Sequence, residues 1–222
     1  MTASIYGDSI STFRDMNPEG HIVYYNTDNC MRHGLADVSD TWWGKVLSEF
    51  RWELLMNASY SGSRVSGDSF PSGCSTQRMK YLKSVQMPDI ILVYLGYNDF
   101  GFSVPLTSDK TDDEMSFKGA YRLMLRRLKD SFPDSKIVCG TIMQNYIFYR
   151  PDLSEKLNKN SSGTPLEAYN EIIREVCSSE KVLLADLHGT GVCCDTLSDM
   201  HCTKRGHREM AEAWISELKK LV

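Results

Sequence analysis

Five short apolar runs are spaced along the chain, and they constrain its fold more than any other feature. They cover residues 3–6, 53–58, 89–95, 136–140 and 181–185, and their apolar residues are successive rather than alternating. Successive apolar residues over so short a length are typical of strands buried on both faces, because a strand with one wet face alternates. The runs therefore predict the strands of a parallel sheet with helices on both sides.

Amphipathic segments separate or follow these runs. In residues 114–129, the apolar side chains fall on one stripe of a helix and most of the basic ones fall outside it. Residues 40–50 show a similar pattern, with Asp40 or Thr41 as the N-cap, and so do residues 210–218. Strands that alternate with helices predict an α/β fold, a three-layer α/β/α sandwich with about five parallel strands.

One further helix start carries a capping signal. Thr164 offers a capping hydroxyl, Pro165 suits the first helical position, and Glu167 stands three residues after the threonine. We therefore expect a helix that begins at Pro165, with Thr164 as its N-cap.

Length, charge and apolar content narrow the class of protein. The chain has 222 residues, of which 41% are hydrophobic, and its net charge is -4, so one core over residues 1–222 is expected and a nucleic-acid partner is not. The longest apolar run, "IILVYL", is too short to span a membrane. No signal peptide is visible in "MTASIYGDS", which favours a cytoplasmic location. The oligomeric state is not indicated.

The tripeptide Gly7-Asp8-Ser9 directly follows the first apolar run. Gly and Asp are common turn residues, so Ser9 is either a nucleophile or a hydroxyl in a turn. The same tripeptide recurs at residues 67–69, where no apolar run precedes it and Pro71 follows. We interpret the second copy as a loop.

Three other blocks hold residues that an activated serine needs. Gly62 lies in the Ser-rich turn "NASYSGSR" after the second run, and Asn98 lies in "LGYND" after the third. His201 lies in "SDMHCTKRGH", before the last helix. Because ligands bind outside the carboxyl ends of parallel strands, blocks that follow strands are expected to meet at one edge of the sheet.

These four blocks, in this order, resemble the SGNH hydrolases, also called the GDSL esterase/lipase family. The resemblance extends from residue 4 to about residue 215. It implies a flavodoxin-like strand order and serine-dependent hydrolysis of a carboxylic ester, without a metal or an organic cofactor. It also implies a nucleophile at Ser9, a general base at His201, and an oxyanion hole made by Ser9, Gly62 and Asn98. Asp8 and Tyr97 are candidate substrate-binding residues.

The acid of the catalytic triad departs from the family's pattern. The family places it three residues before the histidine, where this chain has Ser198. Asp199 comes one residue too late and Asp195 three too early. We favour Asp199 as the acid, with a weakened triad or a dyad assisted by Ser198 as the alternatives. The altered position also keeps a second function open, an SGNH-like ligand-binding protein with weak or no hydrolysis.

The substrate class is only weakly marked. Loops that mix polar and aromatic residues favour a small-molecule ester with a short acyl or acetyl group on a polar alcohol, such as a carbohydrate. Some aromatic residues could line a cleft, with Tyr97 the best candidate because it stands beside Asn98; the others are Trp42, Trp43, Tyr24 and Tyr25.

A metal site is the competing interpretation of the C-terminal cysteines and histidines. Adjacent cysteines rarely bind one ion, and the paired spacing typical of zinc sites is absent, so no metal is expected. The residues concerned are Cys193, Cys194, His201, Cys202 and His207. We expect surface or structural roles for four histidines, which are His21, His33, His188 and His207.

Overall fold

A five-stranded parallel sheet forms the centre of the molecule. The computed structural model describes residues 1–83, 86–145, 159–197 and 200–222. The strand order is β2-β1-β3-β4-β6, and every neighbouring pair is parallel. This confirms the predicted strands and the flavodoxin-like order. The strands are β1 (Thr2–Gly7), β2 (Glu53–Asn57), β3 (Ile90–Tyr94), β4 (Lys136–Gly140) and β6 (Leu183–Ala185).

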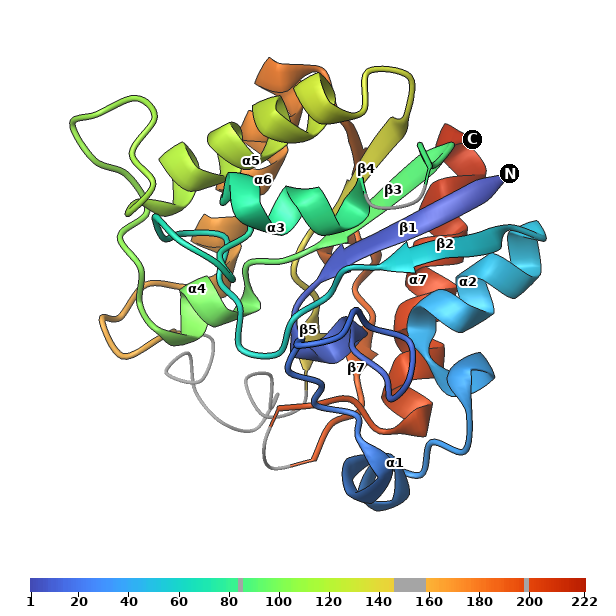
Figure 1. Cartoon of the computed structure of the whole chain (residues 1–222). Helices are drawn as coiled ribbons and strands as arrows, with labels where there is room; N and C mark the ends of the chain where they lie inside the picture. Colours follow the sequence, from blue (N-terminus) through green and yellow to red (C-terminus); the bar gives the residue numbers. More distant parts are fainter. Residues whose placement is uncertain (84–85, 146–158, 198–199) are drawn as a thin grey trace.

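Helices cover both faces of this sheet (Figure 1). On one face, α2 (Trp42–Phe50) packs against α7 (Lys204–Leu221). On the other face lie α3 (Thr76–Leu82), α5 (Phe117–Ser131) and α6 (Leu166–Glu180). All five residues of β3 are buried, whereas the edge strand β2 is buried only at its last residue. The three-layer α/β/α sandwich is therefore confirmed, and its continuous apolar strands are the central ones.

The helix starts agree with the sequence in part. Thr41 caps α2, with its hydroxyl accepting a hydrogen bond from the Gly44 N–H at 3.0 Å. The predicted cap of α6 is wrong, because Pro165 is extended and itself occupies the N-cap position. The N–H of Thr164 donates instead to Asn160 Oδ1 at 2.9 Å, so the polar turn before the helix uses this residue.

Several short elements were not predicted. α1 (Thr27–His33) and α4 (Tyr97–Gly101) are too short to show a clear apolar stripe. β5 (Gln144–Asn145) and β7 (Cys193–Cys194) pair as a second, two-stranded parallel sheet. Within the described ranges, no helix is long and apolar enough to cross a bilayer.

The strand order reverses direction at β1, which lies between β2 and β3. The connections after β1 and β3 therefore separate at their carboxyl ends, and in open α/β sheets such a switch point is where ligands bind. Ser9 follows β1 and Asn98 follows β3. The second Gly-Asp-Ser, residues 67–69, lies in the loop between β2 and α3, as expected.

Candidate active site

Ser9 begins a short 3₁₀-helix, η1 (Ser9–Ser11), at the carboxyl end of β1. Asp8 caps this helix, and its Oδ1 accepts a hydrogen bond from the Ile10 N–H at 3.0 Å. A Cβ atom at Gly7 would come within 2.4 Å of Ser11 Oγ, so only glycine fits there. The Gly-Asp-Ser sequence thus permits a tight turn from the buried strand to the site.

His201 lies beside Ser9 although the two residues are 192 positions apart. The distance between Ser9 Oγ and His201 Nε2 is 2.9 Å, and Ser9 is only 7% exposed. A serine hydroxyl that donates to a neutral imidazole is the arrangement of a nucleophile with its general base.

The segment that carries His201 is held by side chains from the other end of the chain. The carbonyl oxygen of Cys202 accepts hydrogen bonds from the Tyr25 hydroxyl at 2.8 Å and from His33 Nδ1 at 3.1 Å. Met200 has a φ of 70°, which is uncommon for a residue with a side chain. This turn and these two bonds present the imidazole to Ser9.

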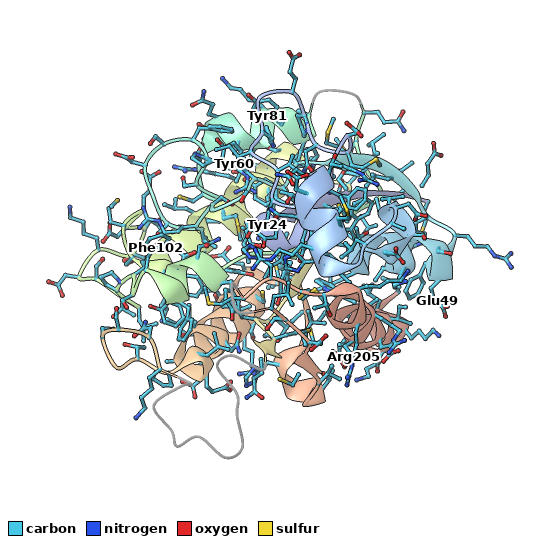
Figure 2. The ribbon with its side chains drawn as sticks, turned by 90° about the horizontal axis from the view of Figure 1, so that it is seen from below. Tyr24, Glu49, Tyr60, Tyr81, Phe102 and Arg205 are labelled. Carbon is cyan, nitrogen blue, oxygen red and sulfur yellow. The ribbon has the colours of Figure 1, made fainter. Side chains whose placement is uncertain are left out.

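Tyr24 lies directly on the face of the His201 ring. The two ring centres are 3.4 Å apart and the planes differ by 8°. The hydroxyl of Tyr24 is 2.9 Å from His33 Nε2, and its backbone N–H donates to the Thr12 hydroxyl at 2.9 Å. Figure 2 shows Tyr24 near the middle of this end of the molecule.

A cavity of about 130 Å³ opens beside Ser9 and His201. Gly62 has a φ of 76°, and no atom lies within 4 Å of the position that a Cβ would occupy, so the main chain is open to a ligand. Asn98 Nδ2 donates one hydrogen bond to the Ser63 carbonyl at 2.9 Å, which leaves the second N–H of this amide for another acceptor. The lining residues are Asp8, Ser9, Ile10, Ser61, Gly62, Tyr97, Asn98, Met200 and His201.

A fully buried arginine holds the frame of this cavity. Arg78, on α3, donates to the carbonyl oxygens of Gly7 and Ala58 and to the Ser63 hydroxyl. It therefore ties the end of β1 to the loop after β2. Asp99, also fully buried, accepts hydrogen bonds from two backbone N–H groups of that loop, those of Val65 at 2.7 Å and Ser66 at 3.0 Å. The sequence carries no pattern that would reveal either role.

Burial changes the protonation of several groups around the site. It raises the pKa of Asp8 to about 7 and that of Asp99 to about 6, against the opposing effect of their hydrogen bonds. It lowers the pKa of His207 to about 3, and His207 Nδ1 accepts the Trp42 N–H at 3.2 Å. Asp8 therefore titrates near neutral pH, whereas His207 stays neutral.

The candidates for the triad acid differ in what the structure describes. Asp195 Oδ2 accepts a hydrogen bond from the Thr203 hydroxyl at 2.5 Å, and Thr203 is the N-cap of α7. The carboxylate of Asp195 thus supports a helix start. Ser198 and Asp199 lie outside the described residues, so the acid at Asp199 stays a prediction.

The other aromatic and histidine residues divide between core and contacts at the site. Trp42, Trp43 and Tyr25 are fully buried or nearly so, whereas Tyr97 lines the cavity. Of the histidines given surface or structural roles, three are buried; these are His21, His33 and His207. His188 Nε2 is 2.9 Å from Glu167 Oε2. Among the side chains that the structure describes, no group of three or more His, Cys, Asp or Glu could hold a metal ion.

The tertiary contacts at the site could not be predicted from the sequence. Tyr24 was only one of several aromatic candidates, and nothing in the sequence pairs it with His201 or with His33. Ser61 and Met200 are adjacent in sequence to Gly62 and His201, so adjacency alone could have placed them in the cavity.

Comparison with known structures finds the same fold in other proteins. Two crystal structures of candidate GDSL-like lipases, from Bacteroides ovatus and Bacteroides uniformis, each match with 23% identity and a TM-score of 0.74. The matches cover 99% of this chain and 98% and 96% of those chains, respectively. A member of the lipolytic G-D-S-L family from Veillonella parvula matches over all of both chains, with 13% identity and a TM-score of 0.62. No curated protein matches the sequence.

A match to a family model shows the family to which the chain belongs. The model of GDSL-like lipase/acylhydrolases matches residues 1–191, a range that includes Ser9, Gly62 and Asn98 but ends before His201. His201 lies in the part of the chain that follows. The chain therefore belongs to the GDSL-like lipase/acylhydrolase family of ester-hydrolysing enzymes.

Proposed function

We propose that the chain is a single-domain serine esterase that forms an acyl-enzyme on Ser9. The observation that carries this proposal is the 2.9 Å contact between Ser9 Oγ and His201 Nε2 beside an open cavity. His201 takes the hydroxyl proton as Oγ bonds to the ester carbonyl carbon, and then gives that proton to the leaving alcohol. Water, activated by the same histidine, breaks the acyl-serine bond and releases the acid.

The oxyanion hole consists of the N–H groups of Ser9 and Gly62 and the side-chain amide of Asn98. All three residues line the same cavity, and Asn98 is held in place through Ser63. The negative charge of the tetrahedral intermediate gathers on one oxygen, and each preorganised donor contributes roughly 3 to 4 kcal/mol to its stabilisation.

Asp199 is the proposed acid that orients His201. This assignment rests on the resemblance to the family, which places a carboxylate shortly before the histidine. It is supported indirectly by Asp195, whose carboxylate bonds to the Thr203 hydroxyl. A dyad assisted by Ser198 is the alternative that mutation must exclude.

The substrate is an ester of a short acyl group with a polar alcohol, such as a carbohydrate. The cavity of about 130 Å³ is smaller than the several hundred Å³ that larger ligands need. Ile10, Tyr97 and Met200 give it apolar walls, while Asp8 and Ser61 add polar groups. Asp8 and Tyr97 are thus candidate contacts to the substrate.

The test combines covalent labelling with a series of acyl lengths. A fluorophosphonate should react with Ser9 and should abolish hydrolysis of 4-nitrophenyl acetate. Peptide mass spectrometry would show which residue carries the label. Acetate and butyrate esters should be cleaved faster than the octanoate ester. An unlabelled Ser9 and no hydrolysis would favour the ligand-binding alternative, and a preference for octanoate would contradict the short-acyl assignment.

A further inference from the structure

We propose that Tyr24 is a positioning residue for His201, one that fixes the plane of the imidazole and stabilises its protonated form. The proposal rests on the proposed function, because it requires His201 to act as a general base. The observation behind it is the parallel contact between the two rings, with centres 3.4 Å apart and planes 8° apart.

The stack constrains the ring without occupying its nitrogens. A face-to-face contact blocks rotation of the imidazole out of its plane, whereas the nitrogens lie in the ring plane and remain available for hydrogen bonds. His201 Nε2 accordingly keeps its 2.9 Å contact with Ser9 Oγ. Tyr24 thus limits the orientation of the base to the one that faces the nucleophile.

The stack also favours the charge that develops during the reaction. The face of an aromatic ring is negative and attracts a cation placed over it. His201 is neutral before the reaction and becomes an imidazolium when it takes the proton of Ser9. The attraction therefore grows toward the transition state, which is the condition for an interaction to increase kcat.

Tyr24 is itself held on both sides. Its hydroxyl contacts His33 Nε2 at 2.9 Å, and His33 Nδ1 donates to the Cys202 carbonyl at 3.1 Å. Cys202 follows His201 directly, so the contacts form a closed circuit from His201 through Tyr24 and His33 back to the same segment. The circuit fixes the tyrosine ring relative to the histidine that it covers.

Besides the proposed acid Asp199, four groups among the described residues bear on the protonation of His201. Ser9 contacts its Nε2, and the ring centres of Tyr25 and His33 lie 6.3 and 6.4 Å from its own. His207, on α7, is close enough for a protonated His201 to lower its pKa, but it stays neutral above about pH 3. His33 is therefore the group whose titration must be separated from the effect of the Tyr24 ring.

The experiment measures kcat/KM against pH with 4-nitrophenyl acetate for Tyr24→Leu and Tyr24→Phe. Tyr24→Leu should lower the plateau roughly 3- to 30-fold and shift the acid limb to lower pH by roughly half a unit, because the imidazolium loses its aromatic neighbour. Tyr24→Phe keeps the ring face and loses the bond to His33. Its acid limb should stay at the wild-type position.

A matched control exists on α3. Tyr81 packs edge-on against His21, with ring centres 4.6 Å apart and planes 77° apart, so Tyr81→Leu also removes a tyrosine–histidine contact. It should move neither the plateau nor the acid limb. A shift of the limb in Tyr24→Phe equal to that in Tyr24→Leu would assign the effect to His33 and overturn the proposal.

A fluorinated series covers the case in which Tyr24→Leu does not fold. Phenylalanine analogues with one, two and three fluorines at position 24 keep the shape of the ring but progressively weaken its negative face. The acid limb should move to lower pH with each fluorine, and an unchanged limb would overturn the proposal. If the wild-type protein shows no hydrolysis that depends on Ser9, the proposed function itself is refuted.

Discussion

The same tripeptide, Gly-Asp-Ser, occurs twice in this chain and has two different environments. In the first copy, Asp8 and Ser9 are 1% and 7% exposed, at the end of the interior strand β1. In the second, Asp68 and Ser69 are exposed in the loop between β2 and α3. Ser9 Oγ contacts a histidine, whereas the Ser69 carbonyl accepts an ordinary turn hydrogen bond from Ser72.

The glycines of the two copies are also needed for different reasons. Gly7 lies where a Cβ would collide with Ser11, so the requirement comes from packing. Gly67 has a φ of 126°, so the requirement comes from the backbone. A motif of three residues therefore becomes a candidate site only where a strand end, a cavity and a distant base meet it.

The largest expected difference between the copies is in activity. Ser9→Ala should lower kcat roughly 10⁴- to 10⁶-fold, because it removes the proposed nucleophile that contacts His201. Ser69→Ala should keep wild-type kcat and KM. Steady-state hydrolysis of 4-nitrophenyl acetate measures both, and equal losses in the two variants would remove the distinction between the copies.

The next largest effect is expected at Asp199, the proposed acid that orients His201 beside the first copy. Asp199→Asn should reduce kcat by up to roughly 10⁴-fold while substrate binding is kept, since a triad aspartate stabilises the imidazolium. Asp195→Asn should change kcat little, because its carboxylate bonds to Thr203. The readout is kcat and KM for each variant.

If neither aspartate matters, the enzyme works as a dyad. Ser198→Asp, which restores the family's usual spacing, would then increase activity. With Asp199 as the acid, the same substitution should be neutral or harmful, because two carboxylates would crowd one site. Wild-type kcat in Asp199→Asn would discard the assignment of Asp199.

A smaller loss of activity is expected when the side-chain amide of Asn98, which lines the same cavity as Ser9 of the first copy, is removed. Asn98→Ala should lower kcat roughly 10²- to 10³-fold with a modest change in KM, because the lost hydrogen bond strengthens only in the transition state. Gln77→Ala, at an exposed position of α3, serves as the control for loss of a side-chain amide. A change confined to KM would make Asn98 a substrate-binding residue rather than an oxyanion donor.

The aspartates of the two copies should differ in how they affect stability. The pKa of Asp8 is raised from its usual 3.8 to about 7 in the folded protein, so folding favours its protonated form. The stabilisation is complete below about pH 4 and is lost as the pH rises toward 7, because the unfolded chain ionises first. Asp8→Asn should remove this decline in the free energy of unfolding, whereas Asp68→Asn should keep it.

Urea denaturation at several pH values between 4 and 8 gives this free energy. The difference between wild type and Asp8→Asn should grow with pH, in favour of the variant. A constant difference over this range would mean that Asp8 is ionised throughout in the folded protein.

The predictable part of the molecule is the part with local physical signals. β1, β3 and β4 are continuous apolar runs because both their faces are buried, and Ser9, Gly62 and Asn98 follow runs whose ends must meet in a parallel sheet. The predicted N-cap of α6 is wrong, because Thr164 belongs to the turn before the helix. Its backbone N–H donates a hydrogen bond to Asn160 Oδ1, four residues earlier.

The unpredictable part depends on contacts between distant segments. Tyr24, His33 and the segment of Cys202 come together only after α1 has docked near the start of α7, and no period or spacing encodes this. Arg78 is similar, since in the sequence a buried arginine that supports the site looks like any exposed residue of a short helix.

The separation of Ser9 and His201 by 192 residues has a consequence for the protein during its synthesis on the ribosome. At the usual pace of synthesis, roughly 10 to 40 s pass on the ribosome between the addition of the serine and that of the histidine. Under the proposed mechanism, a nascent chain in this interval has the nucleophile but not the base, and it does not hydrolyse esters. Under the same mechanism, hydrolysis begins only after His201 has emerged and the following helix α7 has packed against α2, so the onset of activity would report that this helix is in place.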